Sequence, residues 1–488
     1  MSDSATTRTG PSASASTAAD ELCFTPATEL ARLLREKQVS ARELLEAHLD
    51  RIERVNPAIN AIVTMDVDAA RAEAARADET LASGHLLGVL HGLPAAHKDT
   101  HATGGMRTTS GSPTLAQHVP PEDELVVARM RTAGAVRVGK TNVPEFAAGS
   151  HTFNPVFGVT RNPYALDRSA GGSSGGAAAA LAAGLVPVAE GSDMGGSLRN
   201  PAGFCNVVGL RPTPGRVPQH PAVNGFATLS VQGPMGRTVA DVALSLAAMA
   251  GPDARVPISL QDEGSTFAPP LPGTLQNGLR VAWAPTLGGR VPVDAEVREQ
   301  LAGVPEVFAG LGADVTEDCP DLDHADDVFG TLRAWLFELQ LGEVARRHPD
   351  EVKQAIHWNV EKGRQLTGAD VARAEAKHTR LYEKVVEFFE RYDVLLAPTT
   401  QVVPFDIDQE YPTLVDGQQQ ESYLDWMRSC TLISATGAPA LSVPAGFTSS
   451  GLPVGLQVIG PPRADRRVLE VGHVFEQATH FGARRPQL

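Results

Sequence analysis

Two serine-bearing glycine turns lie close together in this chain and constrain how its middle part can fold. They are Gly171-Gly172-Ser173-Ser174-Gly175-Gly176 and Gly195-Gly196-Ser197, with an alanine-rich run between them. Glycine tolerates positive φ and lets backbone N–H groups approach a ligand closely. A serine in such a turn can be presented to a carbonyl while N–H donors point at the same place. Because the flanking stretches at 177–183 and 185–189 are apolar, we interpret the segment as a buried helix and strand, rather than as flexible connections.

Short apolar segments alternate with helical patterns over the rest of the chain. Strands are expected at 87–99, 135–138, 185–189, 279–284, 314–317, 394–397, 441–443 and 455–459, and helices at 26–37, 66–83, 122–133, 175–183, 293–311 and 465–477. Ser40 and Glu43 have the spacing of a capping box, which begins a further helix. The alternation predicts an α/β fold with a mixed, mostly parallel, twisted central sheet that helices cover on both faces.

No repeat and no linker divides the chain, so we expect one domain over residues 21–488 after a disordered tail at residues 1–20. A charged, mostly helical segment at about 323–392 is interpreted as a helical insertion. The polar stretch at about 405–423 is expected to be a mobile loop, because few large apolar side chains anchor it. We expect both segments to overhang the site and select substrates, since function often varies on loops over a rigid scaffold.

Composition and charge argue against several classes of protein. The chain has 57 acidic and 42 basic side chains and a net charge of −15, which argues against a nucleic-acid or anionic-membrane partner. No stretch approaches the roughly 20 apolar residues of a membrane-spanning helix, and residues 1–20 do not resemble a secretory signal. The four cysteines show no metal-ligand spacing, and Cys205 is expected to be a buried packing residue. We therefore expect a soluble, cytoplasmic protein.

A serine nucleophile needs a base. Residues 171–175 formally match the nucleophile elbow of α/β-hydrolases, but the stretch before them, 162–168, is turn-like where an elbow requires a strand. No Gly-Lys-Ser or Gly-Lys-Thr follows either turn, which disfavours a phosphate-binding loop. The remaining base candidate is Lys98, at the end of an apolar strand. Burial there would lower its pKa and leave some neutral amine, whereas a solvated lysine just past the strand is the alternative.

Lys98, the Gly-Gly-Ser-Ser-Gly-Gly turn and the stretch 191–199 together resemble the amidase signature family. Further matches follow in the expected order at 139–146, 162–164, 209–213, 233–241, 437–444 and 451–457, so that the resemblance spans about residues 22–475. It implies a Ser–cis-Ser–Lys triad in which Ser197 is the nucleophile, Ser173 the bridging serine after a cis peptide bond, and Lys98 the base.

The resemblance also implies further roles around the triad. The oxyanion hole would be formed by the backbone N–H groups of Met194, Gly195, Gly196 and Ser197. The residues expected to support the site are Ser174, by hydrogen bonding, and Asp99 and Arg199, as structural partners of the loops. His97 and His101 depart from the family pattern, but His97 should point away from Lys98 on a strand. Met194 also departs from it, and it contributes only a backbone N–H.

The function that the resemblance implies is hydrolysis of C–N bonds in amides, and also of esters and carbamates (urethanes), through a Ser197 acyl-enzyme without metal or cofactor. Neither a carboxylate-binding arginine nor a membrane-entry helix stands out, so small to medium uncharged substrates are expected. A monomer or homodimer is expected as well. One alternative is the glutaminase subunit of an aminoacyl-tRNA amidotransferase, which works beside a partner; the helical insertion and the tail favour a free-standing enzyme. A non-catalytic binding protein is disfavoured, because all three triad residues are present.

Overall fold

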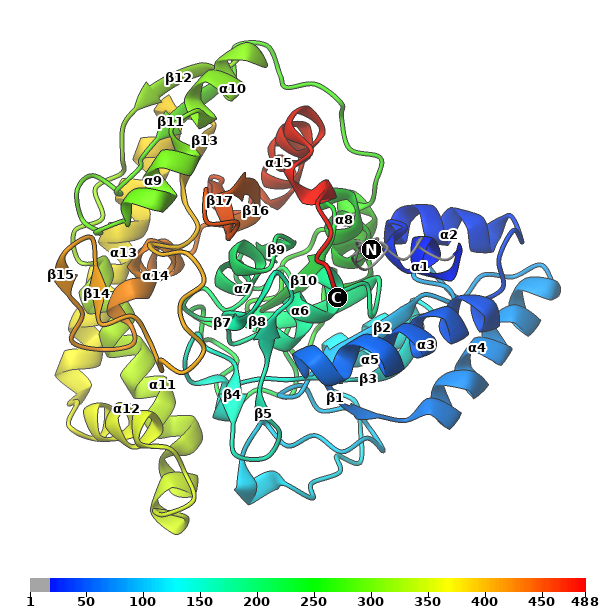
Figure 1. The fold of residues 1–488 in the computed structure, drawn as a ribbon. Coiled ribbons are helices and arrows are strands. Elements are labelled where there is room, and N and C mark those ends of the chain that lie inside the picture. The colour runs from blue at the N-terminus through cyan, green and yellow to red at the C-terminus, as the bar shows by residue number, and fades with distance from the viewer. Residues whose placement is uncertain (1–17) are drawn as a thin grey trace, which may run out of the picture.

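The computed structural model describes residues 18–488 and is built around one large twisted sheet (Figure 1). In this part of the chain the sheet has 11 strands in the order β1-β3-β2-β8-β10-β9-β16-β17-β13-β11-β12. These strands are β1 (Ile62–Met65), β2 (Pro94–Lys98), β3 (Val136–Thr141), β8 (Val188–Asp193), β9 (Val208–Arg211), β10 (Val231–Gly236), β11 (Arg280–Trp283), β12 (Asp314–Glu317), β13 (Val394–Pro398), β16 (Ala440–Phe447) and β17 (Pro453–Ile459). Three small hairpins lie outside it: β4 (Phe153–Asn154) with β5 (Gly158–Val159), β6 (Arg161–Asn162) with β7 (Ala165–Ser169), and β14 (Leu414–Val415) with β15 (Gln418–Gln419).

The mixed α/β sheet is confirmed, but parallel pairing does not predominate in it. Parallel pairs join β3, β2 and β8 near one end and β13, β11 and β12 at the other. All other neighbours are antiparallel, so the expectation of a mostly parallel sheet is wrong. One reason is visible between β16 and β17, where the connection at 448–452 is too short for the crossover that parallel strands require.

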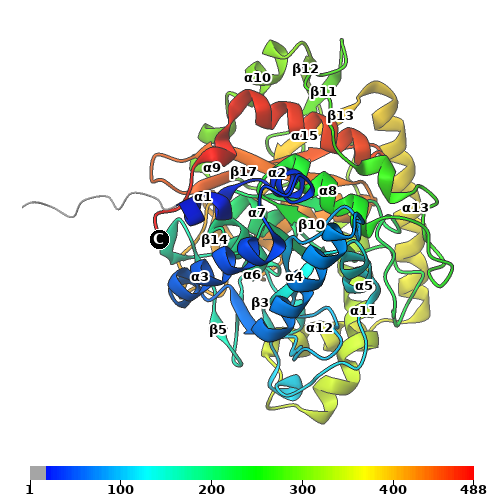
Figure 2. The ribbon, with the colours of Figure 1, turned by 90° about the vertical axis from the view of Figure 1, so that its right-hand side faces the viewer.

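Helices cover both faces of the sheet, as the side chains of β16 show. Leu441 points toward Gly472 of α15, whereas the Oγ of Ser442 and the Cα of Gly203 in α7 both border Gly455 on the other face. Figure 2 shows α3 and α4, which contact β2 and β3, in front of this part of the sheet. The helices are α1 (Ala18–Phe24), α2 (Ala27–Arg35), α3 (Ala41–Ile59), α4 (Val67–Ala82), α5 (Leu125–Thr132), α6 (Gly175–Ala182), α7 (Arg199–Phe204), α8 (Val239–Met249), α9 (Ala295–Leu301), α10 (Val304–Gly310), α11 (Ala325–Arg347), α12 (Gln354–Arg364), α13 (Gly368–Arg391), α14 (Arg428–Thr436) and α15 (Asp465–Thr479).

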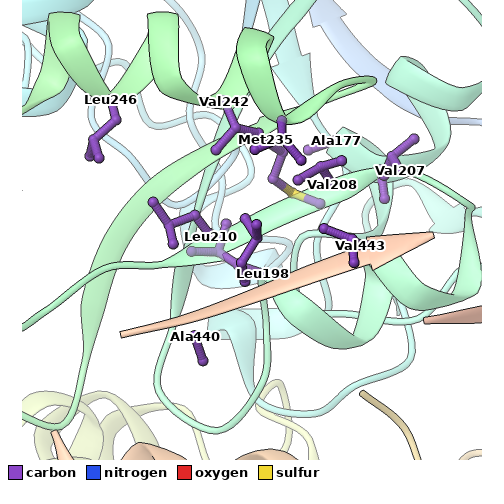
Figure 3. Packing of buried hydrophobic residues seen from close by; sticks show 14 of the residues in the cluster. Ala177, Leu198, Val207, Val208, Leu210, Met235, Val242, Leu246, Ala440 and Val443 are labelled. Atoms are coloured by element: carbon purple, nitrogen blue, oxygen red, sulfur yellow. The ribbon is translucent and has the colours of Figure 1, made fainter. Parts of the chain in front are cut away.

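The core lies between these layers. Leu198 packs with Val208 and Leu210 of β9, Met235 of β10 and Val443 of β16 (Figure 3). All five side chains are completely buried. The alanine-rich helix α6 is buried along its whole length, because small side chains let a helix lie close to the strands. This packing fixes the backbone on either side of both glycine turns.

Local sequence signals predicted some boundaries well and others poorly. The capping box is present: Oγ of Ser40 accepts from the N–H of Glu43, whose carboxylate accepts from the N–H of Ser40. The expected strand 87–99 is confined to β2, because the turn at Gly92 has φ +74°. The expected helix 293–311 is two helices, α9 and α10, and Pro305 lies in the first turn of the second.

Three further expectations are corrected. Residues 18–20, assigned to the tail, already belong to helix α1, and the rest of the expected tail lies outside the described residues. The stretch 162–168, interpreted as turn-like, contributes most of the β6–β7 hairpin. The stretch 405–423 is anchored after all, because Phe405, Val415 and Tyr423 are buried in an apolar cluster with Trp426. Among residues 18–488, no helix combines the length and the apolarity that a membrane crossing requires.

Candidate active site

Lys98 ends strand β2 and is completely buried, at 0% exposed, which excludes a solvated lysine. Its Nζ lies 2.7 Å from Oγ of Ser173, 2.9 Å from Oγ of Ser174 and 3.0 Å from Oγ of Ser192. A neutral amine has two N–H donors and one lone pair. Lys98 can therefore donate to two of these hydroxyls while it accepts a proton from the third. Ser192 was missed by the sequence analysis, although it lies within the quoted motif.

Burial lowers the pKa of Lys98 from 10.5 to about 7, while the carboxylates of Glu190 and Asp193 act in the opposite direction. Without water around it, the charged form of an amine is disfavoured. A substantial fraction of Lys98 is consequently unprotonated near neutral pH. A lysine in that state can act as a general base.

Ser173 stands in the first glycine turn, and the peptide bond between Gly172 and Ser173 is cis, as the resemblance implies. The turn is held from the side by Oγ of Ser150, which donates to the carbonyl of Gly172 at 2.7 Å. Gly175 has no room for a side chain, because a Cβ there would lie 2.3 Å from Oγ1 of Thr152. The glycines of this turn therefore serve close packing around a fixed serine hydroxyl.

Ser197 stands in the second turn, between β8 and α7, and is 9% exposed. The two turns are joined through the backbone, since the N–H of Ser174 donates to the carbonyl of Ser197 at 3.2 Å. Ser197 and Ser173 line the same cavity. Within the described residues their hydroxyls do not form a hydrogen bond with each other. Of the two proton transfers that the resemblance implies, Ser197 to Ser173 and Ser173 to Lys98, only the second has a direct hydrogen bond in this structure.

Asp193 organises the turn that carries Ser197. Its carboxylate accepts from the N–H groups of Gly196 at 2.8 Å and Leu198 at 3.1 Å. The expectation that Gly196 contributes to the oxyanion hole is therefore corrected, because its N–H already has an acceptor. Within residues 18–488 the N–H groups of Met194, Gly195 and Ser197 have no acceptor, so these three remain available as hydrogen-bond donors.

Two buried arginines in turn hold Asp193. Arg199 donates to Asp193 at 2.9 Å and to the side chains of Gln457 and Ser434. Arg211 lies 3.3 Å from the same carboxylate. Burial alone would raise the pKa of Asp193, but the two guanidinium groups hold it below its usual range. The carboxylate therefore remains charged and keeps the turn in place.

A second buried carboxylate lies next to Lys98. It belongs to Glu190, which the sequence analysis missed. It accepts from the backbone N–H of Lys98 at 2.9 Å, and Nδ1 of His101 lies 2.5 Å from its other oxygen. His97 points to Glu190 as well, at 3.4 Å, and has no hydrogen bond with the serines within residues 18–488. The one feature of the sequence that could have indicated Glu190 is its position as an acidic residue at the end of an apolar strand.

Asp99 lies on the far side of the same strand end. It accepts from Oγ1 of Thr109 at 2.5 Å and from the N–H of Thr109 at 3.2 Å. Asp99 thus fixes the loop that follows β2 and makes no hydrogen bond with Ser173, Ser174 or Ser192, the serines around Lys98.

Within the described residues, no group of three or more His, Cys, Asp or Glu side chains is arranged to hold a metal ion.

A cavity of about 280 Å³ opens over Ser173 and Ser197. Part of its wall is polar and is formed by His101, Glu124, Gln219, Ser230 and Gln232. Another part contains the apolar and aromatic side chains of Phe146, Phe329, Phe337, Leu341 and Met427, and Arg333 lies between Phe329 and Phe337 on helix α11. The cavity thus brings the serines together with polar, apolar and charged side chains in one wall.

The helical segment and the polar stretch differ in their relation to this cavity. Helix α11 provides part of the wall, and Tyr423 comes from the end of the polar stretch. The tip of the stretch, residues 418–421, lines a neighbouring hollow that does not include Ser173 or Ser197. The expectation that the whole stretch overhangs the catalytic mouth is therefore wrong for its tip.

Comparison with known proteins identifies the type of site. The model of the Amidase family matches residues 43–469. An acylamidase from Rhodococcus erythropolis is 38% identical over 468 residues, which cover 94% of this chain and 96% of the relative. The chain belongs to the amidase signature family. Its match to the family model includes Lys98, Ser173 and Ser197.

Other amidase signature proteins are also similar over nearly the whole chain. A glutamyl-tRNA(Gln) amidotransferase subunit of Thermosynechococcus vestitus is 36% identical over 487 residues, covering 94% of this chain and 99% of that protein. The crystal structure of a bacterial aryl acylamidase of this family superposes with a TM-score of 0.87 at 30% identity, covering 95% of this chain and 99% of the other. A 6-aminohexanoate cyclic dimer hydrolase gives a TM-score of 0.81 at the same identity and coverage. The protein is thus an amidase signature hydrolase that acts on amides.

Proposed function

We propose that the protein is a free-standing acylamidase that hydrolyses aryl and alkyl amides, and also esters and carbamates, through a Ser197 acyl-enzyme. The observation that carries this proposal is the position of the buried Lys98 amine, 2.7 Å from Oγ of Ser173, at the base of a cavity that Ser197 also lines. Its low pKa supports the role of a base. The similarity to the acylamidase and the aryl acylamidase favours amides of this kind.

In the proposed reaction, neutral Lys98 accepts the proton of Ser173, which takes the proton of Ser197 as Ser197 attacks the carbonyl carbon. The negative charge on the carbonyl oxygen is stabilised by the free N–H groups of Met194, Gly195 and Ser197. As the C–N bond breaks, Ser173 gives a proton to the leaving amine and regains one from protonated Lys98, which is thereby neutral again. Water then hydrolyses the ester by the same route. The contact between the two serine hydroxyls is expected to form with substrate bound, since such contacts are often long in unliganded enzymes.

The proposal is tested by a hydrolysis panel with the purified protein. The panel contains 4-nitroanilides with acyl chains from acetyl to octanoyl, together with an aliphatic amide, an aryl ester and an aryl carbamate. We expect turnover of the anilide without any added protein, metal or cofactor. Failure to release 4-nitroaniline from any acyl chain between acetyl and octanoyl would contradict the acylamidase function.

The alternative is a glutaminase subunit, which is favoured by the 36% identity to the amidotransferase protein over 94% of this chain. The apolar and aromatic side chains in the cavity wall, such as Phe146, Phe337 and Leu341, favour an acyl group with apolar parts that glutamine lacks. Glutamate and ammonia release from L-glutamine, measured beside anilide hydrolysis, separates the two. Glutamine turnover that exceeds anilide turnover, or that requires a copurified second chain, would support the glutaminase.

The rate of anilide hydrolysis should depend on pH through Lys98. Because burial lowers its pKa to about 7 and only the neutral amine accepts a proton, kcat/KM should rise about tenfold per unit below pH 7 and level off above pH 8. The measurement is kcat/KM from pH 5 to 9, with the substrate concentration kept well below KM and protein stability checked at each pH. A profile that stays flat from pH 6 to 9, with chemistry shown to be rate-limiting, would rule out a lysine base.

Shortening the hairpin tip should affect large and small substrates equally. Deletion of residues 417–420 removes a segment that borders only the neighbouring hollow, so acetyl and octanoyl anilides should keep their activity ratio within about twofold. The matched comparison is Leu341→Ala, which enlarges the catalytic cavity itself and should favour the octanoyl substrate by about tenfold, the scale of a few buried methylenes. A ratio changed by the deletion but not by Leu341→Ala would assign selectivity to the tip.

A further inference from the structure

Arg333 is a buried cation in the wall of the catalytic cavity. It lies in the middle of helix α11, on the same face as Phe329 one turn before it and Phe337 one turn after it, and all three line the cavity. Arg333 is buried, with only 5% of the residue exposed. This guanidinium therefore faces the space in which the substrate of the proposed reaction would lie.

The described chain leaves most of the donors of Arg333 unused. One N–H of Nη1 donates to Oδ1 of Asn359, and one N–H of Nη2 donates to the hydroxyl of Tyr423 at 2.6 Å. A guanidinium has five N–H groups in one plane, so three of them have no acceptor within residues 18–488. The ring of Phe337, with its centroid 3.9 Å from Cζ, covers the guanidinium. The ring covers a face of the guanidinium plane and leaves its edge, where an anion binds, uncovered.

Arg333 also differs from every other arginine that is buried in the described part of the chain. Arg199 and Arg211 pair with Asp193, Arg216 pairs with Asp465 at 3.1 Å, and Arg51 pairs with Asp20 at 2.8 Å. Arg333 has no acidic partner within residues 18–488. Burial of an unpaired charge is costly, and a substrate anion would supply the missing partner.

We propose that Arg333 binds a carboxylate of the substrate, so that the preferred amides carry a carboxylate at the end remote from the scissile bond. The planar fork of a guanidinium matches a carboxylate through two parallel hydrogen bonds. The one carboxylate residue in the cavity wall, Glu124, is already engaged by the N–H of Ala102 and the side chain of Gln232. This inference rests on the proposed amide hydrolysis, and it replaces the expectation of uncharged substrates.

Matched substrate pairs test the carboxylate on either side of the amide. On the acyl side, succinyl 4-nitroanilide is compared with butyryl 4-nitroanilide; on the amine side, N-butyryl-4-aminobenzoate is compared with N-butyryl-4-toluidine. In one pair, kcat/KM of the wild type should be at least about tenfold higher for the carboxylate substrate. Arg333→Gln should lower that value about 10- to 100-fold, the scale of hydrogen bonds to a charged group, and should change the neutral partner less than threefold.

Arg347→Gln is the matched control, because Arg347 lies at the exposed end of the same helix and pairs with Glu343. It should leave all four rates unchanged. Equal kcat/KM within both pairs in the wild type would overturn the proposal, and so would an equal loss on both partners in Arg333→Gln. If Arg333→Gln does not fold, the wild-type ratios decide alone.

A binding measurement separates this inference from the proposed function. Glutarate, but not neutral 1,5-pentanediol, should bind the wild-type protein in calorimetry, and Arg333→Gln should weaken glutarate binding at least tenfold while Arg347→Gln does not. Glutarate binding lost in Arg333→Gln, together with no hydrolysis of any anilide, would retain the anion site and reject the acylamidase. Hydrolysis of neutral anilides with no glutarate binding would retain the acylamidase and reject the anion site.

Discussion

Replacing Ser197 with alanine is expected to lower the turnover of an aryl amide by roughly a millionfold, which leaves only the residual acceleration that substrate binding and the oxyanion donors supply. The proposed nucleophile is then absent, while the backbone N–H groups of Met194, Gly195 and residue 197 remain. Lys98→Ala and Ser173→Ala should each cost several orders of magnitude, and combining either with Ser197→Ala should add little, because the three side chains act as one unit. The measurement is the rate of 4-nitroaniline release with each purified variant.

Cys205→Ala is the control for this experiment. Cys205 lies eight residues after Ser197, but it is buried, and burial raises the pKa of its thiol. It should therefore be a packing residue, as the sequence predicts, and its alanine variant should keep turnover within a few-fold of wild type. An active Ser197→Ala protein, free of contaminating enzyme, or an inactive Cys205→Ala protein that is correctly folded would reject Ser197 as the nucleophile.

Asp193→Ala is expected to lower the free energy of unfolding by about 3–5 kcal/mol, because it leaves two buried guanidinium groups without their anion. Arg199 and Arg211 are both 0% exposed, and the N–H groups of Gly196 and Leu198 lose their acceptor as well. Such a loss is a large part of the stability of a typical domain. Urea unfolding, followed by tryptophan fluorescence, measures it.

Glu361→Ala provides the comparison for Asp193→Ala. Glu361 pairs with Arg364 on the exposed surface of α12, and such pairs are screened by water. Its removal should not change the urea midpoint measurably. An Asp193→Ala variant as stable as Glu361→Ala would show that the buried cluster does not hold the Ser197 turn.

The sequence predicted the parts of the site that lie in contiguous motifs. Ser173, Ser174 and Ser197 were found because glycine turns with embedded serines are uncommon, and Lys98 because a lysine at the end of an apolar strand is costly to bury. Their convergence on one cavity is a property of the structure. The cis bond before Ser173 could be expected only from the resemblance.

The residues that the sequence did not reveal make contacts between distant segments. Glu190 reaches the N–H of Lys98 across 92 positions, and Arg333 meets Tyr423 across 90. Nothing local distinguishes Arg333 from the other charged residues of its helix. The order of the strands in the sheet could not be predicted from the sequence either. Strand β10 lies between β8 and β9, which precede it in the chain, and such pairing leaves no periodic pattern in the sequence.

The most direct test of the account is to trap and map the acyl-enzyme. A slowly deacylating aryl carbamate should add one acyl mass to the wild-type protein with a burst of one phenol per chain. Trypsin should release residues 169–199 as one peptide that contains every serine around Lys98, so fragment masses must assign the modified atom. We predict a single adduct on Ser197 that is absent from Ser197→Ala; an adduct on Ser173 or Cys205, or steady turnover of the same carbamate by Ser197→Ala, would contradict the account.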